Sequence, residues 1–173
     1  MRTLAGPYVV AAALLALGGL FKVRRPAPTA RALRAAGLAP LARAARLVGV
    51  AEVAVGLGAL AVDNAVLAGL VAAFYLGFAA FVGLSLIRQA PVEDCGCFGG
   101  GDSPPSIVHL VLDGAAAAVA AAIALGPGGM SLPSALEGQP LAGVPFLALT
   151  VVVAGLAYAT LAVLPRTLAA LKP

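Results

Sequence analysis

Two cysteines are the most reactive side chains in this sequence, and one residue separates them. Cys95 and Cys97 flank Gly96 and are the 2 cysteines of the chain. Extended residues two apart place their Cα atoms near 7 Å, and a turn at Gly96 brings them inside the roughly 4.4–6.8 Å range that a disulfide requires. Because so small a ring is strained and stabilises little, the pair suits a reversible dithiol better than a structural disulfide.

Other chemistry is open to the same two thiols. Thiolates favour Cu(I) or zinc, and His109 could add a third ligand to the sulfurs of Cys95 and Cys97. The thiols could also be inert or bridge to another chain, because thiol reactivity depends on the surroundings of each sulfur. Redox exchange is the leading interpretation, and metal binding and inert thiols are its alternatives.

An acid and a base follow the cysteines. His109 and Asp113 are four residues apart, which places them on one face of a helix. Because histidine titrates near neutral pH, this pair could relay protons to and from a thiol. A hydrogen-bonded pair that only packs the protein interior explains the same spacing.

The chain that must position these residues is too apolar for a soluble domain. Of its 173 residues, 62% are hydrophobic and 10% are charged, and the mean hydropathy is +1.05. Soluble domains contain about 45–50% apolar and about 25% charged residues. Most side chains must therefore face lipid or one another, which excludes disorder, collagen and nucleic-acid binding. The sequence predicts an all-α integral membrane protein.

Five apolar segments are long enough to cross a bilayer, for which a helix needs roughly 20 residues. A short helix capped by Thr29 is expected to lie in the interface, and a Cys-Gly-Cys loop separates the third and fourth spans. The five spans, the interfacial helix and the loop are expected to form one membrane domain. The spans cover about 4–23, 40–62, 64–87, 105–125 and 144–164, the interfacial helix 29–36 and the loop 88–104.

Among the charged residues in these spans, Glu52 and Lys22 could form a pair. Glu52 lies within the second span, where a carboxylate costs about 2.5–3.5 kcal/mol and needs a partner or a purpose. Lys22, near the end of the first span, is its natural counter-ion. This intramembrane ion pair could pin two helices together or take part in function.

Small residues recur at helical spacing and could let helices approach closely. The third span carries Gly69, Ala73 and Gly77, and the second carries Ala54 and Gly58. The pattern is consistent with a compact bundle and carries no chemistry.

Counting the crossings puts the Cys loop and the basic residues on the same side of the membrane. All of the 11 Lys and Arg residues except Arg2 lie on this side. Cytoplasmic loops are enriched in Lys and Arg, so the positive-inside rule predicts that this side is cytoplasmic.

Several of these features together resemble the MauE/DoxX family of redox-associated membrane proteins, with MauE as the nearer branch. The resemblance extends over roughly residues 8–125. It is carried by Gly19–Lys22, the connector at 31–38, the helix with Glu52, and the motif CGCFG at Cys95–Gly99.

The resemblance implies a DoxX-like four-helix transmembrane bundle, to which the segment at 144–164 adds a fifth, C-terminal transmembrane helix. It also implies a thiol–disulfide redox component that works with a thioredoxin-like, MauD-like partner in the maturation of other proteins. For the protein that gives the family its name, the matured protein is methylamine dehydrogenase. Cys95 and Cys97 become the redox pair, and Lys22 and Glu52 the matching charges. Because the chain has one cysteine pair, its electrons would pass to a quinone or to another protein.

Two questions stay open at this stage. Disulfide formation in exported proteins takes place on the outer, oxidising face of a bacterial-type cell membrane, whereas the arginine bias places the loop in the cytoplasm. We predict the cytoplasmic side, with the outer face as the alternative. The alternative functions are a non-catalytic assembly factor or scaffold, and a Cu(I)-handling protein that uses Cys95, Cys97 and His109.

Overall fold

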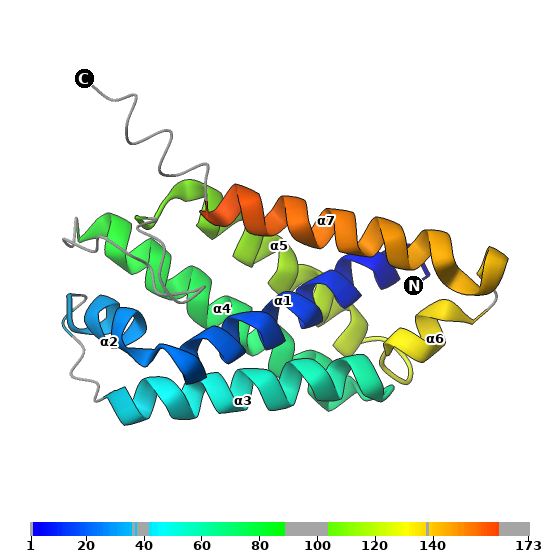
Figure 1. The fold of residues 1–173 in the computed structure, drawn as a ribbon, viewed down its shortest axis with the longest axis horizontal. Coiled ribbons are helices and arrows are strands. Elements are labelled where there is room, and N and C mark those ends of the chain that lie inside the picture. Colours follow the sequence, from blue (N-terminus) through cyan, green and yellow to red (C-terminus); the bar gives the residue numbers. More distant parts are fainter. Residues whose placement is uncertain (1, 36, 38–41, 89–103, 138, 163–173) are drawn as a thin grey trace, which may run out of the picture.

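The computed structural model describes residues 2–35, 37, 42–88, 104–137 and 139–162. This part of the chain is helical and contains no strand, which confirms the all-α fold (Figure 1). Short 3₁₀ turns cover Arg2–Leu4 and Pro140–Gly143. The α-helices are α1 (Ala5–Arg24), α2 (Pro26–Ala35), α3 (Ala42–Ala61), α4 (Ala65–Ile87), α5 (Ile107–Ala124), α6 (Leu132–Leu136) and α7 (Val144–Ala162).

Among the described residues, five helices are long and apolar enough to cross a membrane. They are α1, α3, α4, α5 and α7, with mean hydropathies between 1.7 and 2.3. The first and last residues of each helix lie within about two residues of the limits expected from hydropathy. The agreement arises because the bilayer thickness determines the length of a membrane-spanning helix. The protein is therefore a multi-pass helical membrane protein.

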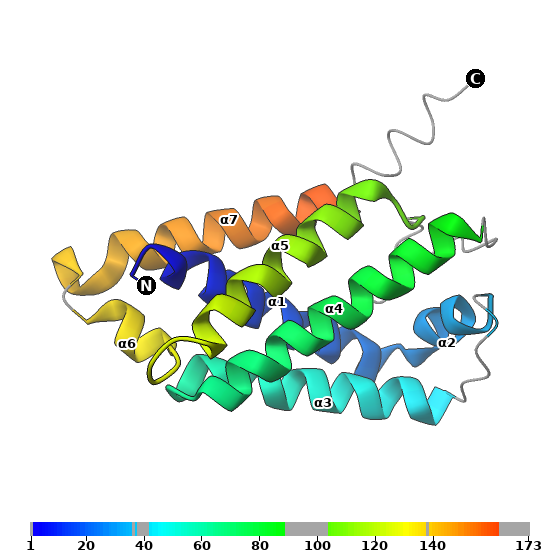
Figure 2. The ribbon, with the colours of Figure 1, turned by 180° about the vertical axis from the view of Figure 1, so that it is seen from behind.

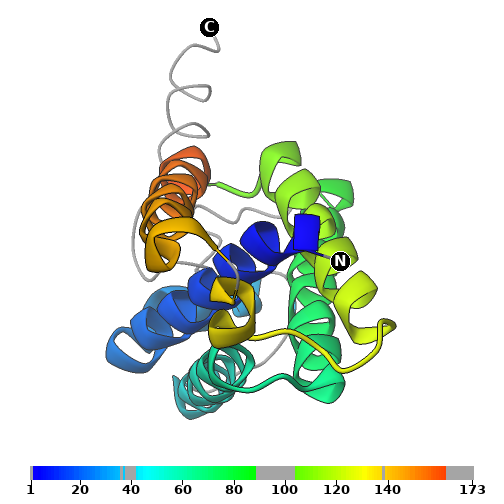
Figure 3. The same cartoon turned by 90° about the vertical axis from the view of Figure 1, so that its right-hand side faces the viewer.

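Helix α1 runs through the centre of the bundle. Figure 3 looks along the bundle and shows the other long helices arranged around it. In an 18-residue window, 56% of the residues of α1 are buried, against 28% in α3, α4 and α5 and 11% in α7. Helices α4 and α5 pack side by side against α1, as Figure 2 shows. The core therefore lies around α1, and α7 is the most peripheral helix.

The two ends of the bundle differ. At one end, here called the α2 end, α1 and α4 finish, α3 and α5 begin, and α2 packs against α3 (Figure 1). At the opposite end, here called the α6 end, lie the turn between α3 and α4, helix α6 and the start of α7. The helices that flank the loop predicted at 88–104 both meet it at the α2 end.

Helix α2 differs from the helix expected at 29–36. It begins at Pro26, and Thr29 is buried within it instead of capping it. Proline is tolerated in the first helical turn, where its missing N–H has no helical partner, so Pro26 and Pro28 start the helix earlier than the Thr29 cap suggested.

The α6 end is closed by contacts between two connectors. Gly129 has φ +77° and packs so tightly on the turn before α4 that an added Cβ would lie 2.5 Å from Asn64 N. Ser134 Oγ donates a hydrogen bond of 2.7 Å to Asp63 Oδ1. Ser131 caps α6 through its hydroxyl, which accepts from Ser134 N. The sequence indicated no helix between the fourth and fifth spans, and the structure adds the short helix α6 there.

The small-residue stripes expected on the second and third spans do not mark the tightest helix contacts. A Cβ added at Gly77 would meet no atom within 4 Å, and one at Gly69 would make only ordinary contact with Ala124. The closest approach lies between α1 and α3, at Gly19, Gly49 and Gly56, where a Cβ would fall within 3 Å of the neighbouring backbone.

Candidate functional site

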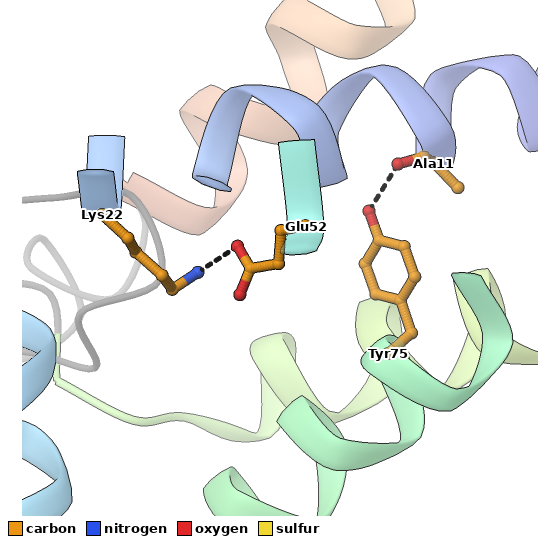
Figure 4. A network of polar contacts seen from close by, with 4 residues as sticks. All are labelled: Ala11, Lys22, Glu52 and Tyr75. Carbon is orange, nitrogen blue, oxygen red and sulfur yellow. Dashed lines mark hydrogen bonds and ion pairs between the residues drawn. The ribbon is translucent and has the colours of Figure 1, made fainter. Parts of the chain in front are cut away.

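A buried ion pair joins α1 to α3. Lys22 Nζ lies 2.8 Å from Glu52 Oε2, and the two side chains are 4% and 0% exposed. Figure 4 shows the pair, together with Tyr75, whose hydroxyl donates a hydrogen bond of 2.8 Å to Ala11 O. The structure thus brings together the two intramembrane charges that the sequence singled out.

Reciprocal glycines set the geometry of this ion pair. Gly19 stands three residues before Lys22, and Gly49 stands three residues before Glu52. A Cβ at Gly19 would lie 2.5 Å from Gly49 O and 2.7 Å from Glu52 Cβ, and a Cβ at Gly49 would lie 2.8 Å from Gly19 O and 2.9 Å from Lys22 Cβ. Each glycine therefore makes room for the carbonyl of the other and for the base of the opposite charged side chain. Close backbone approach of this kind drives helix association in lipid.

The ion pair leaves one carboxylate oxygen available. Glu52 Oε1 is buried and has no hydrogen-bond partner in the part of the chain that the structure describes. The ammonium of Lys22 also lies 4.9 Å from the ring centroid of Phe78, close enough for a cation–π interaction. Lys22 is thus held from two sides, whereas Glu52 can accept a further hydrogen bond at Oε1.

His109 and Asp113 lie near the start of α5 and are both buried, at 1% and 6% exposure. At about 1.5 Å per residue, they stand about 3 and about 9 Å along the helix from Ile107. Ser106 Oγ and His109 Nδ1 form a hydrogen bond of 2.9 Å. The sequence reasoning missed Ser106, although a serine just before a helix and three residues before a histidine is a readable signal.

A cavity of about 350 Å³ connects several of these residues. Its walls come from α1, α4, α5 and α7, with Glu52 contributed by α3, and most of its lining is apolar. Lys22, Glu52 and Asp113 line it together with the rings of Tyr75 and Phe78. No sequence pattern pointed to this cavity, because it is formed by helices that are far apart in the chain.

Cys95 and Cys97 lie outside the described residues, so their predicted redox pairing remains a prediction. Helix α4 ends at Ile87 and α5 begins at Ile107, both at the α2 end, where Lys22 and His109 also lie. The described residues contain no group of three or more His, Cys, Asp or Glu side chains that could hold a metal ion. The alternative metal site of Cys95, Cys97 and His109 also remains a prediction.

The buried Lys, Glu, His and Asp side chains of the described residues are Lys22, Glu52, His109 and Asp113. They comprise an ion pair with a free acceptor atom, a buried imidazole bonded to a serine, and a buried carboxyl group on α5. These groups can hold a proton or accept a hydrogen bond inside an apolar bundle. Ser106 and His109 lie at the start of α5, where the chain returns from the cysteine-containing segment.

One family comparison gives a match, and it covers most of the bundle. The family model described as methylamine utilisation protein MauE matches residues 2–126. The matched residues include α1 to α5 and stop before α6 and α7. No curated protein and no solved structure matches the chain.

Proposed function

The chain belongs to the MauE family of membrane proteins, and from this premise we propose that it is a thiol–disulfide redox component acting through Cys95 and Cys97. The family's description connects it with methylamine utilisation, which suggests an accessory membrane protein of that process. Within that role, the proposed partner is a thioredoxin-like protein, and the proposed task is the maturation of other proteins. A relationship to DoxX proteins is part of the same proposal.

The observation that supports this proposal most is where the cysteine segment is attached. The chain leaves α4 after Ile87 and enters α5 at Ile107, at the same end of the bundle as the last turn of α1, which carries Lys22. Lys22 reaches Glu52, which lies midway along α3. Arg24, Arg25 and Arg88 are exposed at this same end of the bundle. Nearby cations lower the pKa of a thiol and so favour the thiolate, which is the attacking species in disulfide exchange.

The proposed exchange balances without a further reactant. The thiolate of one cysteine attacks a disulfide sulfur of the partner, and a mixed disulfide forms as the partner's second sulfur leaves as a thiolate. The other cysteine of the pair then attacks the mixed disulfide, so that Cys95 and Cys97 become a disulfide and the partner becomes a dithiol. The same steps run in reverse when the partner is the reductant. His109 is the proposed proton acceptor for the thiols, with Asp113 further along the same helix.

Trapping of the mixed disulfide tests this function. Full-length protein is mixed with a thioredoxin-like partner that lacks its own resolving cysteine, and adducts are separated without reductant. We expect an adduct with the wild-type chain and none with the double variant Cys95→Ser/Cys97→Ser. As a matched control, Ala159→Cys in the double variant places one thiol on the exposed face of α7 and should form no adduct.

The other outcomes identify the alternative functions. Partner binding that is unchanged in the double cysteine variant contradicts the redox role and favours a non-catalytic assembly factor. Stoichiometric Cu(I) in the purified wild-type protein, lost together with both cysteines, favours copper handling.

A further inference from the structure

We propose that the cavity between α1, α4, α5 and α7, with Glu52 of α3 in its wall, binds a lipid-soluble quinol whose hydroxyl donates a hydrogen bond to Glu52 Oε1. The proposal concerns binding alone and does not depend on the redox role of the cysteines. Four observations support it: the volume of the cavity, the buried acceptor Glu52 Oε1, the charges of the lining residues and the aromatic side chains in the wall.

The cavity has the size and position of a ligand site. Its volume of about 350 Å³ lies within the roughly 300–1,000 Å³ range of small-molecule pockets, which are mostly apolar with a few fixed polar groups. Its length is lined by side chains such as Val10, Leu14, Leu112 and Val153. Because these walls lie in membrane-spanning helices, an occupant must be soluble in lipid.

Glu52 identifies the hydrogen bond that the occupant must make. Its side chain is completely buried, lines the cavity and binds Lys22 through Oε2, while Oε1 has no partner among the described residues. A buried acceptor without a partner is unfavourable, so a ligand that brings a hydroxyl donor stabilises both itself and the protein. A quinol carries two such hydroxyls on a neutral ring.

The charges in the lining exclude the commonest lipid headgroups. The lining contains the carboxyl groups of Glu52 and Asp113 and one ammonium, that of Lys22, which already binds Glu52. A fatty-acid carboxylate or a lipid phosphate would therefore face two acidic side chains. A cationic head would lose its hydration in a cavity that is otherwise apolar. A neutral donor avoids both penalties.

Aromatic side chains in the wall favour a ring. The rings of Tyr75 and Phe78 meet edge to face with centroids 5.8 Å apart and both line the cavity, and Phe78 lies beside Lys22. Phe146 lines it from α7. Planar ligand rings pack well against such side chains in offset or edge-to-face geometry. A quinol ring at the polar end with its hydrocarbon tail along the apolar walls fits this arrangement.

Binding of a defined quinol tests the proposal. The probe is a radiolabelled benzoquinol with a decyl tail, added without oxygen to the full-length protein in phospholipid nanodiscs. We expect saturable binding of one probe per chain. The dimethyl ether of the probe has the same shape but no donor, so it should bind about tenfold more weakly, the effect expected for one hydrogen bond to a charged acceptor.

Two matched variants locate the site. Ala157 lines the cavity on α7, and Ala159, two residues along the same helix, is exposed and does not. Ala157→Phe should fill the cavity and weaken probe binding at least tenfold, while Ala159→Phe leaves it unchanged. Cys95→Ser/Cys97→Ser should bind the probe like the wild type, so failure of the redox proposal and failure of this one are separate results.

Three results would overturn the proposal. They are binding that does not saturate, equal binding of the quinol and its ether, and equal binding by Ala157→Phe and Ala159→Phe. Saturable binding of a radiolabelled fatty acid that displaces the quinol would instead assign the cavity to a lipid.

Discussion

The backbones of Gly19 and Gly49 touch where α1 crosses α3, and the carbonyl of each occupies the space where the other would carry a side chain. This contact sets the distance at which Lys22 and Glu52 meet. The buried charges and the small residues are therefore parts of one structural unit, whose effects on stability can be separated by mutation.

The first prediction concerns the glycine contact. Gly49→Ala should destabilise the protein by about 1–3 kcal/mol, because the new methyl group meets the backbone of α1 and neither helix can shift cheaply. Gly77→Ala is the matched control, since its Cβ would meet no atom within 4 Å. Alanine there should be neutral or stabilising by up to about 1 kcal/mol. Unfolding of the purified protein in detergent measures both, and equal effects would contradict the tight contact.

The second prediction concerns the ion pair. Lys22→Met alone should cost about 3–5 kcal/mol, because it leaves the fully buried Glu52 without its counter-ion. The double variant Lys22→Met/Glu52→Met should recover most of this loss, since replacing both charges with apolar groups removes the unpaired carboxylate. The free energies of unfolding of the single and the double variant are measured and compared with that of the wild type. A double variant no more stable than Lys22→Met would show that the two charges are not coupled.

The third prediction concerns pH and the α6 end. The hydrogen bond from Ser134 and then those from Ser131 hold the pKa of Asp63 below its usual range. The resulting stability is fully present above the unfolded pKa of about 3.9 and is lost as the pH falls through the lower folded pKa. Asp63→Asn should remove this part of the acid dependence. Melting temperatures of the variant and the wild type, measured from about pH 3 to about pH 6, test this expectation.

Ser134→Ala is a second variant that tests the same acid dependence. It removes the donor that binds Asp63 Oδ1 and should weaken the acid dependence in the same direction. The effect should be small in both variants, because Asp63 is exposed and solvent screens its interactions. An acid dependence that is unchanged in Asp63→Asn would assign it to other carboxyl groups.

The fourth prediction concerns orientation. If the α2 end is cytoplasmic, a membrane-impermeant maleimide should leave Cys95 and Cys97 unlabelled in intact cells and label them after lysis. Glu137→Cys in the Cys95→Ser/Cys97→Ser background places a thiol at the exposed α6 end and should label without lysis. Labelling of the native cysteines in intact cells would place the loop on the outer face.

Hydropathy alone was sufficient to predict the five spans, because each must bury about 20 residues in lipid whatever its neighbours are. Sequence reasoning also singled out Lys22 and Glu52, since a carboxylate is costly inside a membrane and the chain offers few cations to match it. These inferences depend on the bilayer and on local composition, and they need no knowledge of how the helices pack.

Packing is where the sequence was uninformative. Helices that are apolar on every side do not reveal which side faces a neighbour, so neither the cavity nor the role of α7 in its wall could be anticipated. The chain also has 21 glycines, and many pairs have the spacing of a close contact. The stripe at Gly69 and Gly77 fits that spacing as well as Gly49 and Gly56 do, and only the fold distinguishes them.

The contact of Gly129 with Asn64 also determines where the bundle can move. It ties the beginning of α4 to the connector that follows α5, so relative tilting of these two helices has its pivot at that end. Over a helix of about 30 Å, a tilt of about 5° displaces the opposite tip by about 2.6 Å. If α4 and α5 tilt about this pivot, their largest displacement falls at the ends between which the cysteine-bearing segment runs.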